Sequence, residues 1–147
     1  MNWNDLAIIS QIAFTAWFAL THWIPLHPLN NLNEEAFPKE RITNLILHLF
    51  QLASIVGLMF HFIWLMWVGV IFWTLSFIGH IVSWWLPYFF GWPKGFLENA
   101  EVDNAKTYYF LPPRKNHPIP DLNHCIIGIL ALSTMVTCWM AILQDTM

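Results

Sequence analysis

The sequence predicts an all-α integral membrane protein: a four-helix bundle with antiparallel up-down topology, forming a single transmembrane domain over residues 1–147. Of the 147 residues, 57% are hydrophobic and only 10% are charged, whereas charged residues make up roughly 25% of an ordinary soluble domain. Residues 42–90 contain no acidic or basic side chain except three histidines. Because one helical pass needs about 20 apolar residues, this stretch is long enough for two passes.

The first predicted span covers residues 6–24. Asp5 precedes it and no positively charged segment does, so we expect a retained helix and not a secretory signal. It ends near Pro25, which cannot donate a backbone hydrogen bond. The second span, 42–62, is joined to the third by a turn near residues 61–65.

The third predicted span covers residues 64–86 and ends where Pro87 interrupts the helix. The fourth span, 122–143, follows two candidate N-caps, Asp121 and Asn123. Their side-chain oxygens can accept hydrogen bonds from the unpaired amides of the first turn. The turn between the second and third spans contains no proline, Asn-Gly pair or charged residue, and His61, Trp64 and Trp67 favour its placement near residues 61–65.

The distribution of basic residues predicts the orientation. All six lie in the two connections 25–41 and 87–121, which four spans place on the same side of the membrane. By the positive-inside rule this side is cytoplasmic and both termini lie outside, in a bacterial-type plasma membrane. We also expect the second connection to lie on the membrane surface and cap the bundle. The basic residues are Lys39, Arg41, Lys94, Lys106, Arg114 and Lys115.

Each predicted helix carries one polar face, and each face contains one histidine. The four histidines are His22, His48, His80 and His124, all in the half of the bundle nearer the basic connections. Exposing an ionisable side chain to lipid costs several kcal/mol, so we expect them to face the interior. Together they form the predicted cofactor-binding set.

Neutral imidazole binds zinc, copper and iron, and helical bundles build cofactor sites on facing helices. The expected cofactor is therefore a transition metal or haem, with His48, His80 and His124 as metal ligands. His48 and His80 lie deepest and are expected to face each other. Five polar side chains would surround and orient the ligands: Asn44, Gln51, Ser76, Ser83 and Asp121.

Two other interpretations of the histidines remain open. They could relay protons or line a solute path, or each could bond a neighbour and hold helices together. In the last case the chain is a non-enzymatic accessory or immunity-type protein that packs against a membrane-protein partner or a second copy of itself. No motif decides whether the chain is an enzyme. The net charge of −3 and the lack of a basic block argue against a nucleic-acid partner.

Overall fold

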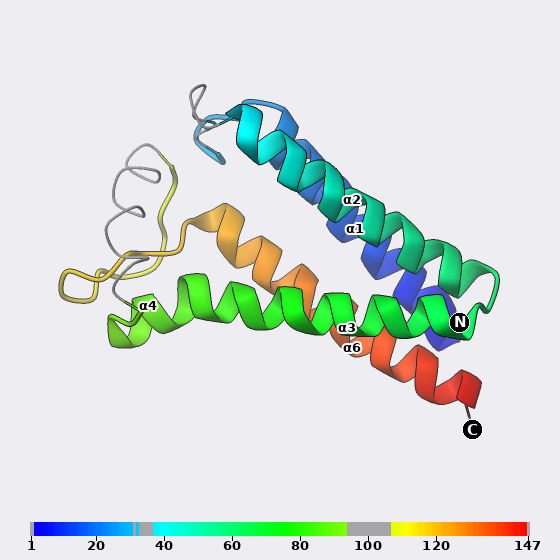
Figure 1. Ribbon diagram of the computed structural model, residues 1–147. Helices are drawn as coiled ribbons and strands as arrows, with labels where there is room; N and C mark the ends of the chain where they lie inside the picture. Colours follow the sequence, from blue (N-terminus) through cyan, green and yellow to red (C-terminus); the bar gives the residue numbers. More distant parts are fainter. Residues whose placement is uncertain (1, 31, 33–36, 94–106, 147) are drawn as a thin grey trace.

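The computed structural model describes residues 2–30, 32, 37–93 and 107–146, and all regular secondary structure in this part of the chain is helical (Figure 1). The elements are α1 (Trp3–Trp23), α2 (Phe37–Met59), α3 (Ile63–His80), the π-helical turn η1 (Ile81–Trp85), α4 (Leu86–Phe90) and α6 (Leu122–Thr146). Four segments are long and apolar enough to cross a membrane: Trp3–Trp23, Arg41–Met59, Ile63–Phe90 and Leu122–Thr146.

Side-chain caps fix both ends of α1. The Asp5 backbone amide donates to Asn2 Oδ1 at 2.8 Å, and the Asn2 amide donates to the Asp5 carboxylate at 3.1 Å. This capping box explains why the helix begins before the predicted residue 6. At the other end, the buried Asn30 side chain donates to the Ile24 carbonyl at 2.7 Å and accepts from the Leu26 amide at 2.7 Å. The chain therefore folds back onto the end of α1.

The turn between α2 and α3 spans residues 60–62. His61 adopts a left-handed conformation with φ 53°, and the Phe62 amide donates to the Gly57 carbonyl at 2.9 Å. Because this turn is only three residues long, α2 and α3 are neighbours in close contact. A Cβ atom added to Gly69 would lie 2.1 Å from Ser54 Oγ, so only glycine fits between them.

The third spanning segment continues past the predicted end at residue 86 and reaches Phe90. In η1 the Leu86 amide donates to the Ile81 carbonyl, five residues back. Pro87 then lies in the first turn of α4, where a missing N–H is tolerated. The helix ends at Gly91, whose φ of 67° is typical of a C-terminal cap.

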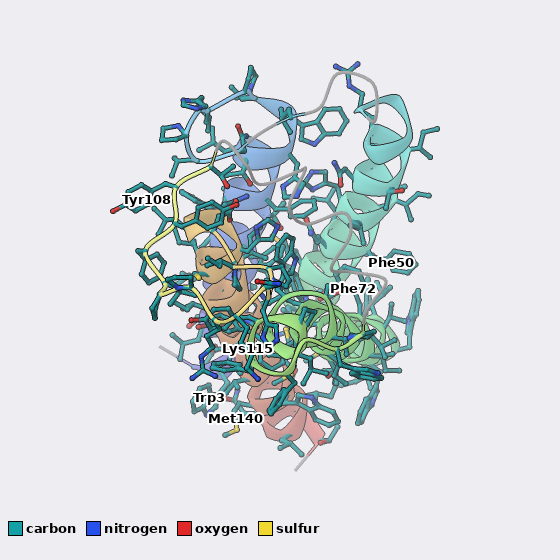
Figure 2. The ribbon with its side chains drawn as sticks, turned by 90° about the vertical axis from the view of Figure 1, so that its left-hand side faces the viewer. Trp3, Phe50, Phe72, Tyr108, Lys115 and Met140 are labelled. Carbon is teal, nitrogen blue, oxygen red and sulfur yellow. The ribbon has the colours of Figure 1, made fainter. Side chains whose placement is uncertain are left out.

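The four long segments pack in a ring. α1 contacts α2 and α6, and α3 contacts the same two helices. In Figure 1, α1 and α2 lie side by side and diverge from α3 toward the end of the molecule where the connections lie, while both chain termini lie at the other end. Figure 2 shows Phe50 and Phe72, stacked with ring centroids 5.5 Å apart, joining α2 to α3.

The two connections meet at the start of α6. The Tyr108 amide donates to the Pro28 carbonyl at 3.0 Å, and the Tyr108 carbonyl accepts from the Leu122 amide at 2.9 Å. Both connections therefore lie at the same end of the helices. Residues 31, 33–36 and 94–106 of the predicted connections, which include Lys94 and Lys106, lie outside the described residues.

The contact between Gly69 and Ser54 leads to a prediction about stability. We expect Gly69→Ala to lower the free energy of unfolding by about 1–3 kcal/mol, because α2 and α3 must separate to admit a methyl group. The matched control is Gly79→Ala, since a Cβ there meets no atom within 4 Å and alanine favours a helix by about 1 kcal/mol over glycine. Denaturant unfolding of both variants in micelles measures the difference, and equal stabilities would contradict the packing described.

Candidate functional site

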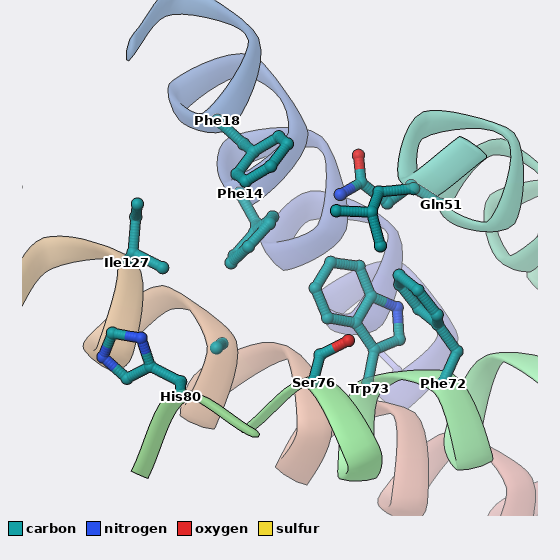
Figure 3. Close-up of a pocket in the computed structure, with 10 residues that line it drawn as sticks. Phe14, Phe18, Gln51, Phe72, Trp73, Ser76, His80 and Ile127 are labelled. Atoms are coloured by element: carbon teal, nitrogen blue, oxygen red, sulfur yellow. The ribbon is translucent and has the colours of Figure 1, made fainter. Parts of the chain in front are cut away.

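A cavity of about 240 Å³ lies between the four spanning segments (Figure 3). Its wall is mainly aromatic and aliphatic, and its three polar side chains come from α2 and α3. The lining residues are Phe14, Phe18, Leu47, Gln51, Phe72, Trp73, Ser76, His80, Ile127 and Ala131. Two of the predicted orienting residues and one predicted ligand therefore line the same space.

A chain of hydrogen bonds fixes the Gln51 side chain. The Trp23 indole N–H donates to His48 Nε2 at 3.2 Å, and His48 Nδ1 lies 2.9 Å from Gln51 Oε1. Because an indole nitrogen can only donate, His48 Nε2 is the acceptor and Nδ1 carries the proton given to Gln51. The Gln51 oxygen is thus occupied, and its amide nitrogen is directed toward the cavity (Figure 3).

His80 forms another part of the wall and has an unused nitrogen. Its Nε2 atom is buried and has no hydrogen-bond partner within the described residues. The ring is held against α6, because a Cβ added to Gly128 would lie 2.7 Å from that same Nε2. An unsatisfied buried polar atom costs about 1–3 kcal/mol. Nε2 faces α6 and not the cavity, so only the rest of the His80 side chain lines the cavity.

Asp121 and His124 form a pair at the start of α6. Asp121 Oδ1 accepts the His124 backbone amide at 2.9 Å and contacts His124 Nδ1 at 2.6 Å, so Asp121 acts as the N-cap. Burial of the Asp121 side chain by itself raises the pKa of its carboxyl group, but the hydrogen bond and charge of His124 outweigh burial and hold that pKa below its usual value. The His124 ring packs on Trp84 of η1 at a centroid separation of 3.5 Å.

His22 lies behind the aromatic wall of the cavity. Its ring stacks on Phe18 with centroids 3.9 Å apart, and its Nδ1 lies 3.0 Å from the Phe18 carbonyl. Each of the four histidines therefore has its own local contacts.

The structure does not bring the predicted metal ligands to one point. His48 does not line the cavity with His80, because both of its nitrogens are bonded to Gln51 and Trp23. Among the described residues, no three His, Cys, Asp or Glu side chains gather closely enough to hold a metal ion. Of the remaining orienting residues, Asn44 is buried and Ser83 is half-buried, and neither lines the cavity.

A second polar cluster at the opposite end of the helices was not predicted. Asn4 Nδ2 donates to the two Asp145 carboxylate oxygens at 3.1 and 3.2 Å, and His61 Nδ1 lies 2.6 Å from Asp145 Oδ2. This terminal cluster joins α1, the turn after α2 and the end of α6. The sequence could have indicated this cluster only through topology. Four spans place both termini and the turn between the second and third spans on the same side of the membrane.

A comparison with known proteins finds no family model, no curated protein and no solved structure that matches the chain. Inference about function therefore depends on the geometry described above.

The cap on α6 leads to a second prediction. Asp121→Ala should lower the free energy of unfolding by about 1 kcal/mol through loss of the cap, whereas Asp121→Asn retains an acceptor for the helix and loses only the charge. Denaturant unfolding in micelles at pH 7 measures both. If Asp121→Ala is as stable as the unmodified chain, the cap assignment is wrong.

The same carboxylate has a defined pH dependence. Because the pKa of Asp121 in the folded state lies below its unfolded value of about 3.9, its charge contributes to stability near neutral pH. That contribution is lost as the pH falls through the lowered pKa. The stability difference between Asp121→Asn and the unmodified chain should therefore shrink below about pH 4.

Proposed function

We propose that this chain is an integral membrane protein that binds a small, mostly apolar molecule in the cavity and donates a hydrogen bond to it from Gln51. The observation that carries the proposal is the Trp23–His48–Gln51 chain, which uses the Gln51 oxygen and leaves its amide N–H groups for the cavity. Ligand pockets are mainly apolar, with a few fixed polar groups. The cavity has this composition.

The geometry supports this function better than the other predicted uses of the histidines. A haem is large, and ligand pockets usually measure about 300–1,000 Å³, whereas this cavity measures about 240 Å³. A metal site would need three ligands at one point, which the described residues do not provide. A proton relay would need one continuous chain of hydrogen bonds, whereas among the described residues the Trp23–His48–Gln51 segment and the Asp121–His124 pair share no side chain.

Two nearly isosteric probes test the proposal. Acetophenone carries a carbonyl where α-methylstyrene carries a methylene group, so only acetophenone can accept a hydrogen bond. Calorimetry with the chain in lipid nanodiscs, corrected for empty nanodiscs, should show tighter binding of acetophenone. Gln51→Leu should weaken acetophenone binding about 3- to 10-fold, the value of one neutral hydrogen bond, and leave α-methylstyrene unchanged.

The matched control is Gln11→Leu. Gln11 is as deeply buried as Gln51 but contacts Cys138 and does not line the cavity, so this variant reports on stability alone. Equal acetophenone affinity in Gln51→Leu and Gln11→Leu would contradict the proposed function. It would favour the accessory role, in which the histidines only hold the helices together.

We further infer an antiparallel up-down arrangement across a bacterial-type plasma membrane, with the connections in the cytoplasm and the termini outside. The contact between Asn4 and Asp145 supports this by joining the start of α1 to the end of α6. The bond between Tyr108 and Pro28 supports it at the other end. The described basic residues near that end include Arg114 and Lys115.

Cysteine labelling tests the arrangement. In a chain carrying Cys125→Ser and Cys138→Ala, an impermeant maleimide should label Thr146→Cys in intact bacterial cells. It should label Lys115→Cys only after permeabilisation, because the positive-inside rule places that residue in the cytoplasm. Both positions are exposed, so accessibility within the protein is matched. The reverse pattern would overturn the orientation, and labelling of both in intact cells would overturn the four-span topology.

A further inference from the structure

A short loop between Pro112 and His117 packs against α4, the last turn of the third spanning segment. The Tyr88 hydroxyl donates to the Pro112 carbonyl at 2.9 Å, and His117 Nδ1 donates to the Tyr88 carbonyl, also at 2.9 Å. The His117 amide closes a turn by donating to the Arg114 carbonyl at 3.0 Å. The backbone of this loop is therefore fixed against the end of the segment.

Arg114 in this loop lies over two aromatic rings of α4. Its guanidinium carbon is 5.0 Å from the centroid of Phe89 and 5.7 Å from that of Tyr88. Contact with an aromatic face positions a guanidinium, whose five N–H donors form a rigid fork that matches the oxygens of a phosphate. Within the described part of the chain, Arg114 forms no ion pair. The fork is therefore available to an anionic partner.

Lys115 adds a second positive charge at the same place. Its side chain is exposed, and it lies in the turn closed by Arg114 and His117. Like Arg114, it forms no ion pair with another described residue. Asp121, the described carboxylate nearest in sequence, is buried and bonded to His124. The described residues therefore leave both positive charges without a negative partner.

These charges lie at the level where a bilayer carries its phosphate groups. Arg114 contacts α4, with which the apolar segment Ile63–Phe90 ends. At this end Phe90 and Trp92 are 72% and 60% exposed, and exposed aromatic side chains at a helix end are typical of the membrane–water interface. Anionic phospholipids attract basic residues that lie just beyond a spanning helix. A phosphate at this level would meet both charges, and its acyl chains would meet the aromatic rings.

We propose that Arg114 and Lys115 form a binding site for the phosphate of an anionic phospholipid, whose acyl chains lie against Phe89 and Phe90. Charge complementarity favours an anionic lipid over phosphatidylcholine, because a choline group would bring a third positive charge beside the two basic side chains. The site is separate from the cavity, since none of these residues lines it. It therefore does not depend on the ligand proposed for the cavity.

The test compares two lipids that have the same acyl chains, dioleoyl phosphatidylglycerol and dioleoyl phosphatidylcholine. Native mass spectrometry of the chain in a neutral detergent gives an apparent Kd for each lipid. We expect the anionic lipid to bind more tightly. Arg114→Gln and Lys115→Gln should each weaken phosphatidylglycerol binding about 5-fold, the contribution of one basic residue near an anionic membrane surface. Both variants should change phosphatidylcholine binding less than twofold.

The matched control is Arg41→Gln. Arg41 is also exposed, and its guanidinium also lies over an aromatic ring, that of Trp23 at 6.0 Å, but it belongs to α2. This variant should bind phosphatidylglycerol within twofold of the unmodified chain. An equal loss in Arg41→Gln and Arg114→Gln would overturn the site, because net charge alone would then explain the binding. Equal affinity for the two lipids, or displacement of phosphatidylglycerol by an equal concentration of glycerol 3-phosphate, would also overturn it.

Discussion

A polar side chain inside a membrane has to find its hydrogen bonds within the protein, because hydrocarbon supplies none. This requirement organises the interior of the bundle. Gln11 reaches the Cys138 thiol, His48 is held between Trp23 and Gln51, and Trp17 donates to Asn123 at 2.9 Å. Most of these bonds join two different helices. Among the described residues, a few buried polar atoms, including His80 Nε2, have no hydrogen-bond partner.

The sequence predicted the four long helices because their apolar stretches are far longer than any that a soluble core requires. It also predicted Asp121 as one of two candidate caps, since an N-cap is a local property that depends on a few neighbouring residues. The helix ends were harder to place. Pro87 favours a break, but a π turn lies directly before it and the helix continues to Phe90.

Partners between helices could not be predicted. Helical spacing identified a polar face on α2 that contains His48 and Gln51, but it did not show that Trp23 would occupy the second histidine nitrogen. From the sequence, Trp23 is typical of an interfacial anchor. Once that nitrogen is occupied, His48 becomes the group that orients Gln51. The polar group that faces His80 across the cavity is then an amide and not a second imidazole.

The π turn also changes the direction in which one continuous helix presents its side chains. One extra residue in a turn advances every later position by about 100° around the helix axis. Before η1, Trp73, Ser76 and His80 line the cavity. Within η1, Trp84 packs on His124, and after it the Tyr88 hydroxyl donates to the Pro112 carbonyl at 2.9 Å. A single helical segment therefore has two angular phases: one presents side chains to the cavity, and the other presents Tyr88 to the connection that leads to α6.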